Sequence, residues 1–285
     1  MKEIEKLKIK AKKGNLKAIR VLASKYYFGD KKTIHSHSII PKNSEEAIRW
    51  SKIGISKGDT YCLDLLGYCY HMGDGVEQNN FKAKYYWELA EKKGSSSAQY
   101  NLGIFHENGW AVHKNAKKAL SYYKKNIKKK NSNKNNSLKG IARIYIDGAG
   151  VKKNLKKGIK YYKIAAKGGD LRAMFELANI YDEKISFKRY EGIRKNQILA
   201  HKYYLLLAKK KFIFGEIQVA EFYLNKIKRG IDIKKNKKLY LQYMERARKN
   251  KNFDIIDQMN FPRDLTIALK EKYSKLLANI ESPLI

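Results

Sequence analysis

Residues 58–94 read GDTYCLDLLGYCYHMGDGVEQNNFKAKYYWELAEKKG, and this stretch carries the unit from which most of the chain is built. Cys62, Leu66 and Tyr70 follow one another at intervals of four, which is one face of a helix with 3.6 residues per turn. The glycines at 73 and 75 favour the end of that helix, because glycine adopts the positive φ of a C-terminal cap at little cost. Asn79 is placed to cap a second helix with its side-chain oxygen. The stretch therefore predicts two helices joined by a glycine turn.

The same pattern recurs six times, in phase, along the chain. An asparagine precedes each second helix: Asn43, Asn79, Asn115, Asn154, Asn196 and Asn236. Seven residues later every copy has an aromatic residue: Trp50, Tyr86, Tyr122, Tyr161, Tyr203 and Tyr243. Each first helix has an aliphatic residue followed by a small one, which leaves room for close contact with the second helix: Leu22-Ala23, Leu66-Gly67, Leu102-Gly103, Ile141-Ala142, Leu177-Ala178 and Val219-Ala220. Four residues after the aliphatic comes an aromatic or histidine: Tyr26, Tyr70, His106, Tyr145, Tyr181 and Tyr223. A helix with one apolar stripe buries it only against neighbours, so these copies predict a stacked array.

This pattern resembles the Sel-one-like repeat family, relatives of the tetratricopeptide repeats. The resemblance rests on the Leu-Gly-x-x-Tyr positions, the Asn-x-x-x-Ala segment and the Gly-x-Gly-Val turn of residues 73–76 and 148–151. It extends over residues 11–251. It implies an all-α, right-handed superhelical α-solenoid of about six helix-turn-helix repeats, with the first helices lining a concave face. It also implies an adaptor role without catalytic residues.

The expected organisation is a repeat array over residues 1–251 and a C-terminal helical cap over residues 252–285. Pro262 starts the last helix, whose leucines are available to cover the final repeat. An insertion between Gly29 and Asn43 holds His35 and His37. We interpret it as a loop, because a metal site would need further ligands nearby.

The formal net charge is +35, and it supports two interpretations. One is a basic surface that binds nucleic acid or an anionic membrane. The other is biased amino-acid usage, since 52 lysines stand against 10 arginines. Arginine is the residue suited to bidentate phosphate contacts, so its scarcity favours the second interpretation.

The sequence contains no recognisable catalytic motif. A glycine-rich phosphate loop, a paired-histidine zinc motif and a nucleophile elbow are all absent. The expectation is therefore a protein that is not an enzyme and that needs no cofactor or metal. His106 takes the tyrosine position of its repeat, which favours a packing role.

The expected compartment is the cytoplasm. The first residues lack the apolar core of a signal peptide, and no apolar run is long enough to span a bilayer. Export by a dedicated secretion apparatus would leave no such mark. Cys62 and Cys69 lie seven residues apart on one predicted helix, about 10 Å along its axis and beyond disulfide reach. Buried, reduced cysteines are the favoured interpretation. The sequence leaves the oligomeric state open.

The candidate partner site is the concave face that the resemblance implies. Its positions fall five and two residues before each aliphatic residue and two, five and six after it. They hold five basic and six acidic residues, so this face lacks the lysine excess of the chain. Mixed charge with aromatic anchors suits an unidentified protein or peptide partner better than nucleic acid. The alternative is that some of the aromatics pack between adjacent first helices. The principal candidates are Tyr27, Phe28, Tyr61, Asp64, Tyr68, Tyr100, Glu107, Arg143, Phe175 and Phe214.

Overall fold

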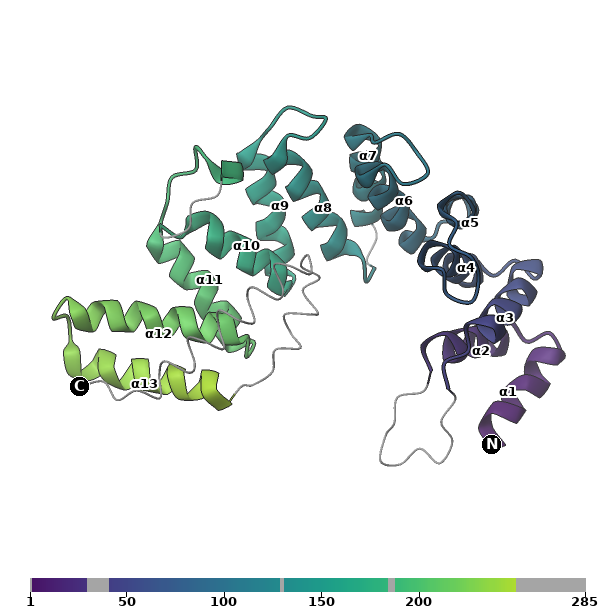
Figure 1. Ribbon diagram of the computed structural model, residues 1–285, viewed down its shortest axis with the longest axis horizontal. Helices are drawn as coiled ribbons and strands as arrows, with labels where there is room; N and C mark the ends of the chain where they lie inside the picture. Colours follow the sequence, from purple (N-terminus) through teal and green to yellow (C-terminus); the bar gives the residue numbers. More distant parts are fainter. Residues whose placement is uncertain (1, 30–40, 129–130, 184–187, 250–285) are drawn as a thin grey trace. The chain divides into compact units, whose positions relative to one another are not determined.

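The computed structural model describes residues 2–29, 41–128, 131–183 and 188–249. The expected cap over residues 252–285 and both His35 and His37 lie outside these ranges. Within the described ranges all regular structure is helical (Figure 1). The thirteen α-helices there are α1 (Lys2–Lys12), α2 (Leu16–Phe28), α3 (Ser44–Ser56), α4 (Thr60–Met72), α5 (Asn80–Lys92), α6 (Ser96–Asn108), α7 (Ala116–Ile127), α8 (Lys134–Asp147), α9 (Leu155–Lys167), α10 (Leu171–Tyr181), α11 (Gln197–Lys209), α12 (Ile213–Lys228) and α13 (Ile233–Lys249), with a 3₁₀ turn η1 (Lys188–Tyr190).

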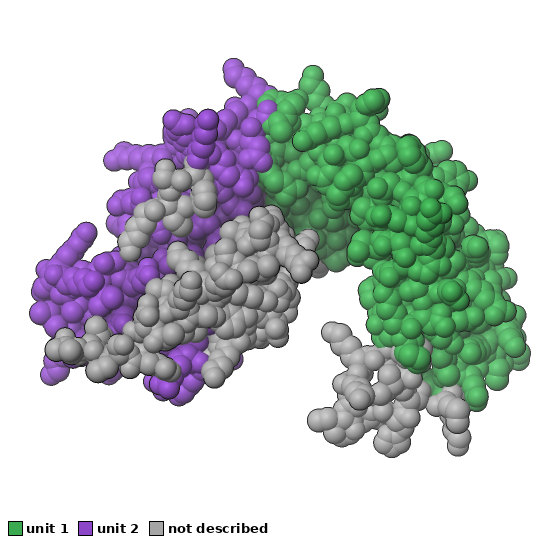
Figure 2. Space-filling view, viewed as in Figure 1, with its two compact units in different colours: residues 1–144, 149–151 green, residues 145–148, 152–285 purple. Residues whose placement is uncertain are grey.

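The helices pack in sequential pairs that match the predicted repeats. Helix α2 packs on α3, α4 on α5, and α6 on α7, and the same order continues to α12 on α13. The predicted all-α repeat fold is thus confirmed, while its handedness stays a prediction. The chain divides into unit 1, residues 1–144 with 149–151, and unit 2, residues 145–148 with 152–285 (Figure 2). No described helix has the length and apolar composition to cross a bilayer.

The asparagine caps are confirmed in five repeats and wrong in the sixth. The side chains of five asparagines accept the backbone N–H three residues on: Asn43, Asn79, Asn115, Asn154 and Asn196. Asn236 is instead buried inside α13, which begins at Ile233, and its side-chain amide donates to the Ile231 carbonyl at 2.7 Å. The two helices of this last repeat are closely joined, because α12 continues to Lys228 and only four residues separate it from α13.

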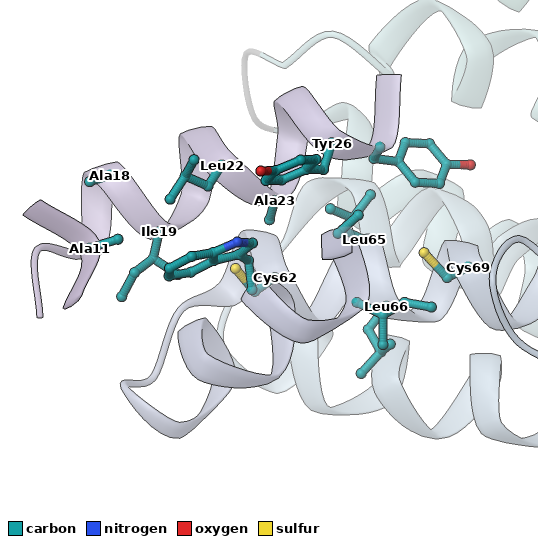
Figure 3. Packing of buried hydrophobic residues seen from close by; sticks show 14 residues of the cluster. Ala11, Ala18, Ile19, Leu22, Ala23, Tyr26, Cys62, Leu65, Leu66 and Cys69 are labelled. Carbon is teal, nitrogen blue, oxygen red and sulfur yellow. The ribbon is translucent and has the colours of Figure 1, made fainter. Parts of the chain in front are cut away.

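The predicted close contact with the second helix is confirmed at the two glycines among the small first-helix residues. A Cβ atom added to Gly67 would lie 2.6 Å from Trp87 Nε1, and one added to Gly103 would lie 2.4 Å from the Tyr123 ring. Figure 3 shows the core of the first two repeats, a single cluster to which α2 contributes Leu22 and α4 contributes Cys62 and Leu66. Only glycine lets the two helices of a repeat approach this closely.

The repeated aromatics form half-buried ring stacks between the two helices of a repeat. Tyr70 and Tyr86 stack with ring centres 5.6 Å apart and an interplanar angle of 7°. The equivalent stacks are His106–Tyr122, Tyr145–Tyr161, Tyr181–Tyr203 and Tyr223–Tyr243. The tyrosines that the second helices contribute are partly exposed, whereas His106 and Tyr181 of the first helices are buried. Cys62 and Cys69 are free and buried, as expected.

Candidate functional site

The first helices of unit 1 carry eight of the ten candidate residues. Helix α2 contributes Tyr27 and Phe28, α4 contributes Tyr61, Asp64 and Tyr68, α6 contributes Tyr100 and Glu107, and α8 contributes Arg143. Phe175 and Phe214 belong to unit 2. Each of these side chains lies on the first helix of a repeat.

An apolar patch forms where α2 and α4 end. Tyr27 is buried, and its ring makes edge contacts with Phe28 at 4.9 Å and Tyr68 at 5.8 Å. Phe28 is 69% exposed, Tyr68 is 40% exposed, and Met72, one turn beyond Tyr68, is 53% exposed. We call Phe28, Tyr68 and Met72 the α2–α4 patch. Phe28 and Tyr68 both contact the Tyr27 ring, and Met72 follows Tyr68 by one helical turn, so these exposed apolar side chains gather around the ends of the two helices.

Tyr27 is held in place by Asp74, which lies in the turn of the second repeat. The Tyr27 hydroxyl donates to Asp74 at 2.8 Å, and the Lys42 ammonium donates to the same carboxylate at 3.1 Å. Burial and this hydrogen bond raise the pKa of Tyr27, so the phenol remains a donor. Tyr27 therefore positions the patch and is not itself open to a partner.

Asp64 is engaged by the neighbouring repeat. The Ser95 hydroxyl, which also caps α6, donates to Asp64 at 2.5 Å. The Trp87 indole N–H donates to the Asp64 backbone carbonyl at 3.1 Å. Burial raises the pKa of Asp64 to about 6 even though the Ser95 hydrogen bond opposes the shift. Its carboxylate thus joins two first helices and is not an open acidic contact.

Glu107 and Arg143 form a second tie between neighbouring first helices. Arg143 donates to both oxygens of Glu107, at 2.7 and 2.8 Å. The Tyr123 hydroxyl donates to Glu107 at 2.7 Å. Bidentate geometry of this kind fixes orientation as well as charge. The structure thus brings Glu107 and Arg143 together, and their charged groups are occupied chiefly by each other.

Tyr61 and Tyr100 are half-buried and lie beside polar ties of the same kind. The Arg20 guanidinium lies 5.9 Å from the centre of the Tyr61 ring and donates to Asp59 at 2.6 Å. Asp59 is buried and caps α4. Tyr100 lies 6.0 Å from Tyr123, ring centre to ring centre.

Phe175 and Phe214 are buried in unit 2, with ring centres 4.8 Å apart. They pack with Phe212 and Tyr204. Their assignment to an open binding face is corrected, as is that of Tyr27. For these three aromatics, packing between helices is the role that the structure supports.

Two features of unit 1 were missed from the sequence. Trp110 is partly exposed just after α6 and lies 4.9 Å from His71, ring centre to ring centre. The second feature is a pocket beside His106 on α5 and α7. The sign of this pocket in the sequence was His106, which occupies a position that is tyrosine in the other repeats. In the part of the chain that the structure describes, no three histidine, cysteine or carboxylate side chains gather as metal ligands.

Comparison with known proteins gives the family of these hairpins. The Sel1 repeat profile matches residues 22–59, 60–95, 96–127, 138–170 and 171–212. The chain belongs to the Sel1 repeat family. The hairpin of α12 with α13 continues the Sel1 repeats structurally beyond the last matched stretch.

Similar Sel1 repeat proteins include a curated plant protein and two bacterial structures. The chain is 32% identical over 114 residues to the ERAD-associated E3 ubiquitin-protein ligase component HRD3B of Arabidopsis thaliana, covering 40% of this chain and 17% of that protein. It thus spans less than a fifth of that relative. A Sel1 repeat protein from Oxalobacter formigenes superposes with a TM-score of 0.63 at 20% identity, over 83% of this chain and 89% of the other. A protective antigen of uropathogenic Escherichia coli with an SLR fold gives a TM-score of 0.56 at 18% identity, over 96% and 63%. Members of this scaffold family generally mediate protein interactions and are generally non-catalytic.

Proposed function

We propose that this Sel1 repeat protein is a non-enzymatic adaptor that binds a protein or peptide on the first-helix face of unit 1. The α2–α4 patch carries the proposal, because Phe28 and Met72 leave more than half of their apolar surface in water. Exposed apolar groups of this size beside one another mark interaction sites, and aromatic anchors contribute much of the affinity at protein interfaces. The proposed compartment is the cytoplasm, where Cys62 and Cys69 stay reduced.

Charge around the patch indicates the kind of peptide. On this face of unit 1 the acidic side chains of Asp64 and Glu107 accept hydrogen bonds from Ser95 and Arg143. Lys17 and Arg20 of α2 are exposed. A segment with apolar anchors flanked by acidic residues complements this arrangement, because opposite charges steer the encounter and fix the register.

Site-specific photocrosslinking tests the proposal. A benzoylphenylalanine placed at Met72 is expected to capture one partner in cells, and the same group placed at Lys92 on α5 is not. The partner is then purified and its affinity is measured against Phe28→Ser with Met72→Ser. Loss of two apolar anchors is expected to weaken binding by about tenfold or more. Both side chains are mostly exposed, so the melting temperature should not change.

The matched control reverses two exposed lysines of the second helices, Lys52→Glu and Lys92→Glu. These lie away from the first-helix face, on α3 and α5, and should leave the affinity within about twofold. If the control abolishes binding and the patch variant retains it, the adaptor proposal for this face is wrong.

One observation favours the alternative, a basic-surface binder of nucleic acid or anionic membrane. Helix α9 presents four lysines beside Ile159 and the exposed Ile164 along an open hollow of about 550 Å³: Lys156, Lys160, Lys163 and Lys167. For such a surface, the logarithm of the binding constant would fall linearly and steeply with the logarithm of the salt concentration. Anionic vesicles and duplex DNA titrated against salt distinguish this function from the adaptor.

A further inference from the structure

The pocket of unit 1 beside His106 has a volume of about 670 Å³ and lies over α5 and α7. Its lining is rich in donors and cations: Lys84, His106, His113, Lys118, Ser121, Tyr122 and Lys125, with Glu88, Val112 and Asn115. None of these residues belongs to the α2–α4 patch. The pocket is therefore a feature separate from the proposed adaptor face.

His106 is the residue that sets this repeat apart. Repeats two and four have tyrosine at the equivalent position, and the lysine three residues after the capping asparagine lies over that ring. Lys82 Nζ is 5.3 Å from the centre of the Tyr70 ring, and Lys157 Nζ is 5.5 Å from that of Tyr145. In repeat three the ring is the His106 imidazole, and the equivalent lysine is Lys118.

His106 does not take the place of the tyrosine as a cation–π partner for that lysine. The cation–π attraction of Lys82 and Lys157 depends on an electron-rich ring, and Lys118 instead disfavours the charged form of His106. Among the described residues no carboxylate lies within salt-bridge distance of the Lys118 ammonium, whereas Lys84 pairs with Glu88 at 2.9 Å and Lys125 with Glu91 at 3.2 Å. Lys118 is thus a cation at the pocket without a counter-charge.

His106 lines the pocket and is itself largely buried. Its Nδ1 atom is buried without a hydrogen-bond partner among the described residues, which costs free energy. An anion that drew a hydrogen bond from the imidazole would offset part of that cost. Burial, with Lys118 and Lys84 nearby, lowers the pKa of His106, and a bound anion would act in the opposite direction.

We propose that this pocket binds a phosphate monoester, with Lys118 and His106 as its principal donors and Ser121 within the lining. Of the three lysines in the lining, Lys84 pairs with Glu88 and Lys125 with Glu91, so Lys118 is the cation left for a phosphate monoester, which carries a charge of about −1.5 to −2 at neutral pH. The volume leaves room for an organic group larger than phosphate against Tyr122 and Val112. The phosphate can belong to a free small molecule or to a phosphorylated side chain of a partner.

Calorimetry on the full chain with phenyl phosphate tests the assignment. Saturable binding is expected, and both Lys118→Met and His106→Tyr should weaken it by about tenfold. His106→Tyr restores the residue of the other repeats, so it should fold and rebuild the cation–π contact. Lys82→Met, the same lysine position in repeat two, is the matched control and should change affinity by less than about twofold.

Two further measurements complete the test. With sulfate, which stays dianionic from pH 5 to 8, affinity should fall as pH rises, and the His106 imidazole resonance should titrate at higher pH when the anion is bound. The groups that face His106 are Lys84 and Glu88 on α5 and Lys118 and Tyr122 on α7.

A phosphoserine peptide that binds more tightly than phenyl phosphate identifies a partner side chain as the source, and equal affinity identifies a free monoester. Absence of saturable binding, or equal weakening in Lys82→Met, overturns the site.

Discussion

Tyr123 shows how tightly single residues fix the packing of these repeats. Its ring lies between two glycines of successive first helices, because Cβ atoms on Gly103 and Gly140 would lie 2.4 and 2.6 Å from it. Its hydroxyl donates to Glu107, and burial raises the pKa of the phenol well above its usual value. One side chain thus joins α6, α7 and α8, and both flanking positions must stay without a side chain.

We expect Gly103→Ala to lower the free energy of unfolding by about 1–3 kcal/mol, because the added methyl group overlaps the buried ring. Chemical denaturation measures the change. Combining Gly103→Ala with Tyr123→Leu should cost less than the two single changes together, since the smaller side chain relieves the overlap. Strict additivity would show that the ring and the glycine do not interact.

Asp64 makes the protein less stable as pH rises. A carboxylate paired at the surface would have the opposite effect. Its folded pKa of about 6 lies above the ordinary value of 3.8, so the folded state holds the extra proton between those values. The contribution of Asp64 is therefore greatest in acid and is lost as pH rises through about 6. Between about pH 4 and 7, wild type should lose about 1–3 kcal/mol relative to Asp64→Asn. Parallel pH profiles of the two proteins would refute the assignment.

At the scale of helices, polar ties connect the successive first helices of unit 1. Arg20 reaches the N-cap Asp59, Ser95 reaches Asp64, and Arg143 reaches Glu107. Each tie gives a carboxylate a hydrogen-bond donor from the neighbouring hairpin, so the ties fix the register between the two. This explains why charged residues persist on a face that is largely packed.

We expect Arg143→Ala to destabilise the protein by about 1–3 kcal/mol, because Glu107, only 13% exposed at its side chain, would lose its counter-charge. The matched control is Arg49→Ala, which breaks an exposed pair with Glu46 and should cost no more than about 0.5 kcal/mol. Thermal denaturation of both variants measures the difference. Equal small effects would mean that solvent screens the Glu107–Arg143 pair.

At the scale of the whole molecule, the most extensive helix–helix contacts among the described residues join helices adjacent in the chain, and the polar ties between successive first helices of unit 1 add to them. Helix α6 packs on α5 and α7, and α12 packs on α11 and α13. In such arrays stability is approximately a sum of repeat and nearest-neighbour contributions, so local damage does not reach distant repeats directly.

Hydrogen exchange tests this locality in the Gly103→Ala variant. Deuterium uptake should rise in α6 and α7 and in their neighbours α5 and α8, and stay unchanged in α12 and α13. Lys117→Ala, at an exposed position of α7, is the control and should alter no helix. A uniform rise over all helices would indicate one cooperative unit instead of coupled repeats.

The sequence by itself determined the repeat, its helices and their local signals. Asparagine caps, glycine turns and small first-helix residues were predicted correctly in most copies because each depends on residues a few positions apart. Asn79 and Gly103 behave as the spacing predicts. Asn236 does not, because α13 starts earlier and takes the asparagine into its interior.

Only the tertiary structure decided which residues of the first-helix face are open. Tyr27 and Phe28 are adjacent in sequence, yet one is buried and the other is 69% exposed. Asp64 and Glu107 look like open acids in sequence but are held by Ser95 and Arg143, about one repeat away in the chain. Burial and charge pairing at each position depend on side chains that the next repeat supplies. The spacing within a repeat predicts where a side chain is placed, and the neighbouring repeat decides what it contacts.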